Sequence, residues 1–150
     1  MRRSAYILLP CLLAPACVGE VVHRQYPTCA AAVAAGEQTR GWLPEWVPNT
    51  ASDLHLQSDL DSNEWWLRFR LPGAARDSLK SRLTPADPTS VRPSKPGGAA
   101  WWFEGLVQNE PANDGALNAQ IYRRCCDPIK RTIVLAFDRN TANVYVWVER

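Results

Sequence analysis

The stretch Glu64-Trp65-Trp66-Leu67-Arg68-Phe69-Arg70-Leu71 decides the fold class of this chain. Its apolar residues recur at every second position, which is the period of a β-strand with one face in a core. The residues of that face are Trp65, Leu67, Phe69 and Leu71. Pro72 and Gly73 stop the pattern, because proline cannot donate a hydrogen bond to a neighbouring strand. We therefore predict a half-buried strand over residues 64–71.

Other strands are predicted on both sides of this one. Four segments have the composition of strands: 53–56, 120–126, 130–137 and 144–149. The last two flank a polar turn region at 138–143 and predict a β-hairpin. Because Thr132–Phe137 is apolar on both faces, we predict it to be the central strand of the sheet.

Two short helices are predicted between the strands. Thr28 is a suitable N-cap and Gly36 a suitable terminator for the small-residue run between them. Ala75, Leu79 and Leu83 recur every four residues and predict a second helix. Since strands outnumber helices and short turns join them, we predict an α+β domain. Its antiparallel sheet would have four or five strands, with two short helices packed on one face.

The length of 150 residues favours one folded domain, which we place at residues 28–150. The stretch 85–98 contains four prolines and two glycines and hardly a large apolar side chain. It is predicted to be a flexible, Pro-rich surface loop of that domain, since strands resume directly after it.

The N-terminus has the pattern of an export signal. Arg2 and Arg3 precede an uncharged run that is far shorter than the ~20 residues of a membrane-spanning helix. Ala14-Pro15-Ala16 offers the small residues that a signal peptidase accepts, which predicts a removable signal peptide over 1–16. The segment Leu13–Cys17 resembles the lipobox of bacterial lipoproteins, which implies a lipidated Cys17, followed by a tether over 17–27. Plain secretion is the alternative.

Charge excludes one class of partner. Removing residues 1–16 takes away two of the 17 basic residues, which leaves 15 against 15 acidic ones. A neutral chain without clustered lysines and arginines has no footprint for nucleic acid. Membrane attachment would therefore come from the lipid anchor. In a cell with two membranes, Val18 lacks the aspartate of inner-membrane lipoproteins, and the resemblance implies the periplasmic face of the outer membrane.

Three cysteines remain after the lipidated one, and export favours disulfide bonds between them. Cys125 and Cys126 are adjacent, so on a strand they would point to opposite faces. We therefore predict that Cys29 is bonded to one of the two. A C-x-x-C redox motif is missing from the sequence.

Metal and catalytic motifs are incomplete. Asp59–Asn63 begins like a calcium loop, but Glu64 and Arg70 occupy positions that require glycine and a carboxylate, so a capped turn is expected and no metal. Asp53 and His55 would share a strand face, as two parts of a hydrolytic triad. No G-x-S-x-G motif supplies a nucleophile. We expect no enzyme and no cofactor.

Tryptophan is abundant, with seven residues in the chain. Most are expected in the core, but Trp42, Trp46 and Trp66 have less obvious burial and are candidates for ligand contact. Within the segment Gly41–Pro48 we expect Trp42 to act first as a buried structural clamp. Trp46 is expected at a more exposed position.

The same segment carries a family resemblance. Arg40-Gly41-Trp42-Leu43-Pro44 and Val47-Pro48, followed by Asp61-Ser62-Asn63 and an aromatic strand, resemble the YbbD head domain of small bacterial proteins. The resemblance covers about residues 28–71. It implies an exported or lipid-anchored domain of unknown role and assigns no catalytic residue.

Together these patterns favour a non-enzymatic lipoprotein domain of the bacterial cell envelope, whose specific role is unknown. The alternative is a binding module that uses Trp42 and Trp46 to hold a cell-wall glycan or peptide. The third possibility is a small hydrolase that uses His55.

Overall fold

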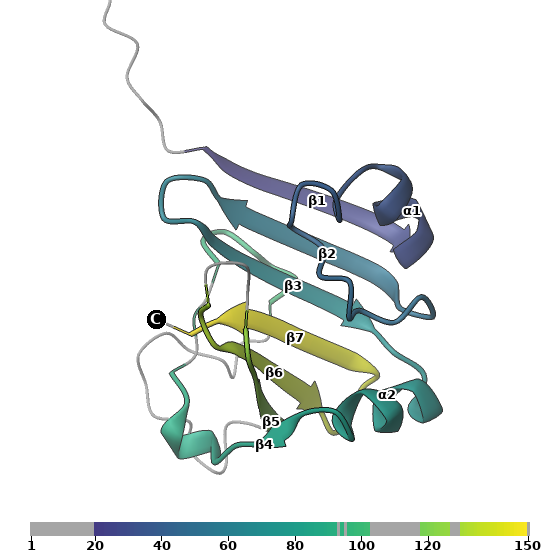
Figure 1. Ribbon diagram of the computed structural model, residues 1–150, viewed down its shortest axis with the longest axis vertical. Helices are drawn as coiled ribbons and strands as arrows, with labels where there is room; N and C mark the ends of the chain where they lie inside the picture. Colours follow the sequence, from purple (N-terminus) through teal and green to yellow (C-terminus); the bar gives the residue numbers. More distant parts are fainter. Residues whose placement is uncertain (1–19, 93, 95, 103–117, 127–129, 150) are drawn as a thin grey trace, which may run out of the picture.

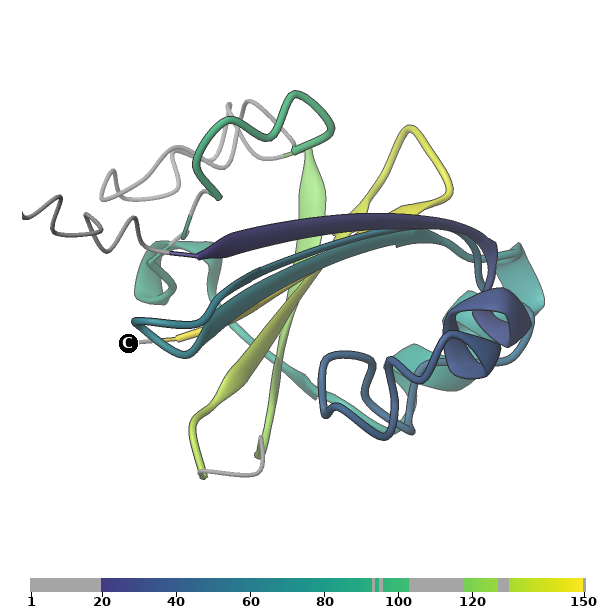
Figure 2. The ribbon, with the colours of Figure 1, turned by 90° about the horizontal axis from the view of Figure 1, so that it is seen from above.

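The computed structural model describes residues 20–92, 94, 96–102, 118–126 and 130–149. These residues form one antiparallel sheet of seven strands in the order β1-β2-β3-β7-β6-β5-β4 (Figure 1). The strands are β1 (Val21–Thr28), β2 (Ser52–Asp59), β3 (Glu64–Arg70), β4 (Thr84–Pro85), β5 (Ala119–Arg124), β6 (Ile133–Asp138) and β7 (Asn143–Val148). The sheet is strongly twisted, so that the strands at its two ends cross in Figure 2.

The prediction of an antiparallel sheet with two helices is confirmed, although the described domain is mostly β and the strand count was wrong. The five strands predicted with stated bounds are present, and β1 and β4 are additional. A strand was also expected directly after residue 98, but Trp101 and Trp102 are not in a strand, and residues 103–106 lie outside the described residues. β1 covers part of the stretch 17–27, which we predicted to be a tether, and ends at Thr28. None of its residues is buried, so its sequence has no apolar face from which a strand could be predicted. β4 has two residues, too few to show a period. Both additional strands lie at the edges of the sheet.

The middle position of the sheet belongs to β7, and not to β6 as we predicted. β6 is buried along its whole length, as its apolar sequence requires. It pairs with β7 and β5, whereas β7 pairs with β6 and β3 and thereby joins the two halves of the sheet. Burial on both faces therefore showed that β6 has a neighbour on each side, but it did not show which strand is in the middle of the sheet.

One face of the sheet, called here the first face, is covered by helices α1 (Cys29–Ala34) and α2 (Gly73–Lys80) and by the loop 35–51 between α1 and β2. This loop passes in front of the strands in Figure 1. The predicted ends of α1 are confirmed, whereas α2 ends before Leu83, the last residue of the predicted stripe. The Thr28 side chain accepts a hydrogen bond from Ala31 N at 3.2 Å, and Gly36 has a φ of 83° just after the helix.

The opposite, second face is covered by the described residues of segment 86–102, part of which is seen above the sheet in Figure 2. This segment includes the 3-10 helix η1 (Pro88–Ser90). Val91, Ala99 and Trp102 of this segment are buried against it. Indole N–H groups of the sheet hold the segment: Trp66 donates to Ser94 Oγ at 3.0 Å and Trp147 to Arg92 O at 3.2 Å. The described residues of the predicted flexible loop 85–98 therefore lie in this cover.

Candidate ligand-binding site

The loop 35–51 is fixed by one buried glutamate. The carbonyl oxygen of Glu37 accepts hydrogen bonds from the backbone N–H groups of Trp42 at 3.0 Å and Leu43 at 3.1 Å. Its carboxylate has no exposed surface and is surrounded by three donors: Arg40 at 2.8 Å, Arg24 at 3.4 Å and the Tyr26 hydroxyl. Buried charge is tolerated when it is paired in this way. The loop therefore has a defined shape at the first face.

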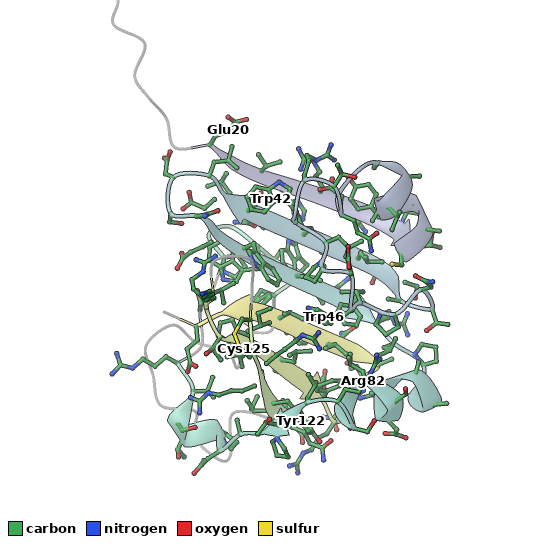
Figure 3. All side chains as sticks on the ribbon, viewed as in Figure 1. Glu20, Trp42, Trp46, Arg82, Tyr122 and Cys125 are labelled. Carbon is green, nitrogen blue, oxygen red and sulfur yellow. A yellow bond between two sulfur atoms is a disulfide. The ribbon has the colours of Figure 1, made fainter. Side chains whose placement is uncertain are left out.

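Within this loop the buried positions are Leu43 and Val47, with 1% and 2% of their surfaces exposed. Trp42 and Trp46 are both half-buried at the border of the core. In Figure 3 Trp42 lies over β1 and β2, and Trp46 lies farther across the sheet toward β7. Trp42, which we expected to be a buried clamp, is thus only half-buried, and the fully buried side chains of this stretch are those of Leu43 and Val47.

A pocket of about 390 Å³ opens beside Trp46 on the first face. The rings of Trp46 and Trp65 line it together with the buried side chains of Leu43 and Ile133. Its polar side chains include Gln38 and Glu45, and Cys126 completes one side. Trp42 is not among the lining residues. The structure therefore separates the two tryptophans that we predicted to bind together.

Trp66, the third candidate, lies on the other side of the sheet. It is 5% exposed, and its indole N–H is occupied by the Ser94 hydroxyl. The prediction that it contacts a ligand was wrong, because the cover of the second face could not be recognised from its sequence.

An arginine that the sequence did not single out stacks on Trp46. The guanidinium carbon of Arg124, the last residue of β5, lies 4.5 Å from the centre of the Trp46 ring. The Nε atom of Arg124 is buried and has no hydrogen-bond partner in the described part of the chain. Burial, and secondly the charge of Arg82, lower the pKa of Arg124. No local motif announces this pairing, because 78 positions separate the two residues.

The cysteine pairing differs from the prediction. Cys125 and Cys126 are bonded to each other, and Cys29 is a free, buried thiol. Burial raises the pKa of Cys29. Cys29 follows β1, whereas the other two follow β5, and four strands lie between β1 and β5. Five spacings of about 4.8 Å between neighbouring strands give a separation of roughly 24 Å, well above the ~7 Å that a disulfide can span between Cα atoms.

Asp53 and His55 meet as predicted, near the second face. His55 Nε2 lies 3.2 Å from Asp53 Oδ1, and Arg68 Nη2 lies 2.6 Å from Asp53 Oδ2. Asp53 has a φ of 49° next to an irregularity in the β2–β3 pairing, which brings its carboxylate to both partners. The ring of Trp101 lies 5.5 Å from that of His55. The sequence did not reveal the contributions of Arg68 and Trp101.

The surroundings of His55 favour its uncharged form. Burial, and secondly the charge of Arg68, lower the pKa of His55. Its Nδ1 atom is buried and has no hydrogen-bond partner in the described ranges. The group thus consists of an Asp53–Arg68 ion pair with an attached neutral imidazole.

The turn 59–63 is capped as expected, since Asp59 Oδ1 accepts hydrogen bonds from Asp61 N at 3.0 Å and Ser62 N at 3.2 Å. Over the residues that the structure describes, no group of three or more His, Cys, Asp and Glu side chains is placed to hold a metal ion. Likewise, no helix in these ranges has the length and apolar character needed to cross a membrane.

Fold and pocket together define a mostly β domain with a ligand-sized cavity between a loop and a twisted sheet. Residues 20–70 match the family model of the YbbD head domain, which confirms the resemblance suggested by the loop motif. The match begins ahead of the motif and includes β1. No curated protein and no solved structure matches the chain. The pocket has contributions from both sides of the match boundary, since Cys126 and Ile133 lie outside it.

Proposed function

We propose that this chain is a non-enzymatic, lipid-anchored domain of the bacterial cell envelope that binds a glycan in the Trp46 pocket. The observation that carries the binding role is the arrangement of two indole rings around a cavity of about 390 Å³ with polar side chains among its lining. This volume lies within the ~300–1,000 Å³ of small-molecule sites.

The chemistry of the lining favours a sugar. Indole rings offer broad apolar surfaces on which the C–H face of a pyranose can stack. The Gln38 amide both donates and accepts hydrogen bonds, and the Glu45 carboxylate accepts them from hydroxyl groups. A ligand that is apolar on its ring faces and rich in hydroxyl groups at its edges matches both properties. A cell-wall peptide is the competing ligand.

The location is argued from the sequence. The export signal over 1–16 and the lipobox at Cys17 support a lipid anchor, and Val18 supports the periplasmic face of the outer membrane in a cell with two membranes. Replacing Cys17→Ser removes the thiol that would carry the diacylglycerol. We expect loss of membrane fractionation and of palmitate labelling, since a neutral domain has no other strong attraction to lipid. Continued labelling of the variant would contradict the anchor.

The absence of catalysis is also part of the proposal. The Asp53 carboxylate is shared between Arg68 and His55, an arrangement that a structural ion pair explains. The His55 ring is 9% exposed and packs beside Trp101, so access to it from solvent is narrow.

Binding is tested by calorimetry with soluble peptidoglycan fragments and neutral oligosaccharides such as chitotetraose. We expect Trp46→Ala to weaken binding at least tenfold and Trp42→Ala, a matched change four residues away and outside the lining, to leave it nearly unchanged. Equal effects of the two variants, or binding of the peptide portion alone, would contradict a glycan site in this pocket.

A further inference from the structure

Arg124 differs from the other half-buried arginines near the sheet, because each of those has an acceptor for its side chain. Arg76 donates to the carbonyl oxygens of Thr141 and Asp138, and Arg131 donates to that of Asn63. Arg24 and Arg40 pair with Glu37, Arg68 with Asp53, and Arg123 with Glu149. Across the described residues, Arg124 has no carboxylate within ion-pair distance, and the structure gives it a ring contact with Trp46 alone. The nearby charge that acts on Arg124 is that of Arg82, which is also positive.

Such a position is unfavourable for a cation unless an anion compensates it. A guanidinium that loses water without gaining a carboxylate retains an uncompensated charge, and here one N–H group is buried without an acceptor. Stacking on the indole ring recovers part of that loss. The remaining N–H groups form a planar fork, whose geometry matches the two oxygens of a carboxylate.

The position also connects Arg124 to the pocket. Its stacking partner Trp46 is a pocket wall, and Cys126, two residues farther along the chain, is another. Arg124 itself is not among the lining residues, and its guanidinium lies over a face of the Trp46 ring. A ligand that contacts this ring from the pocket would therefore lie beside the guanidinium. The carboxylate of Glu45 is exposed to solvent, so its attraction to the guanidinium of Arg124 is weak.

We propose that the pocket selects an acidic glycan, with a carboxylate of the sugar bound by Arg124 and the sugar ring held against Trp46. This inference rests on the proposed glycan-binding function and specifies its ligand class. A uronic acid or another carboxylate-bearing sugar has the required chemistry.

The test compares tetragalacturonate with its methyl ester, which has the same rings without the charges. We expect the wild-type domain to bind the acid at least tenfold more tightly than the ester at low salt. Arg124→Gln is expected to remove that preference while retaining binding of the ester. Arg123→Gln is the matched control, since this adjacent arginine is paired with Glu149, and it should keep the preference.

Each outcome decides the inference. Equal binding of acid and ester by the wild type overturns it without needing any variant, as does an Arg124→Gln protein that keeps the preference. Failure to bind either probe, or preference for a dipeptide such as Ala-Ala over tetragalacturonate, also overturns it. If the acidic probe fails but chitotetraose still binds in a Trp46-dependent way, the proposed glycan-binding function stands and only the preference for acidic sugars is overturned. If no glycan binds, the proposed function and this inference are both overturned.

Discussion

On the first face of the sheet, two helices and a loop fixed by Glu37 supply the cover, whereas on the second face an irregular, proline-containing segment does so. The first cover is organised around one of its own buried residues, because Glu37 accepts hydrogen bonds from the loop backbone and from Arg40, and also from Arg24 and Tyr26 of β1. The second is held from the sheet, because Trp66, Trp147 and Gln57 donate hydrogen bonds outward to it. A cover whose regular structure is limited to the short 3-10 helix Pro88–Ser90 can thus be positioned by donors on the strands below it.

The largest expected effect concerns the first cover. Leu43→Ala removes a side chain that is 1% exposed, and we expect it to cost about 2 to 5 kcal/mol of unfolding free energy. Trp42→Ala should cost less, about 1 to 2 kcal/mol, because part of that ring remains in water in the folded state. Denaturant titration of both variants checks the order. If Trp42→Ala is the more damaging change, the tryptophan and not the leucine is the clamp.

A smaller effect is expected on the second cover. Trp66→Phe keeps most of the buried ring and removes the N–H group that bonds Ser94, which should cost about 1 kcal/mol. The change should appear as faster proteolysis and faster amide exchange in the described part of 86–102, with β1 and α1 unaffected. Ser94→Ala is the control that removes the same bond from the other side. Uniform destabilisation of both faces would show that the two covers unfold as one unit.

The smallest effect is a pH dependence near the second face. Because the folded-state pKa of His55 is lowered, the unfolded chain takes up the proton first as the pH falls below about 6.5. The stability contributed by neutral His55 is therefore present above that pH and is lost at lower pH. Thermal melts between about pH 7 and 5 should show the decline, and His55→Gln should flatten it. A decline of equal slope in His55→Gln would assign it to other groups.

Periodicity and capping signals in the sequence predicted part of the fold. β3, the β6–β7 hairpin and both helices followed from alternation and spacing, and Trp65, Leu67 and Phe69 lie in the first core as expected. β1 could not be predicted, because an edge strand without a buried residue has no apolar face. Segment 86–102 could not be assigned to its face, because single buried residues such as Val91 have no period.

The candidate site was predicted in the same partial way. Trp46 was identified from its type and its place in a proline-bounded loop, and Asp53 and His55 from their spacing in a strand. Trp65, Ile133 and Arg124 come from strands distant in the sequence, so the sheet order had to be known before they could be placed beside Trp46. The cysteine pairing was wrong for the same reason, since it depended on how far apart β1 and β5 lie.

The register between β3 and β7 has a consequence for where this protein can be divided. β3 is the last strand of the region that matches the family model, yet its second neighbour is the last strand of the chain, with Trp66 opposite Trp147 and Phe69 opposite Val144. A fragment that ended at residue 70 would expose a long apolar edge with a row of unsatisfied backbone groups, which invites intermolecular pairing. In this chain the region that matches the family model is therefore an open half-sheet, which β7 closes from outside the match.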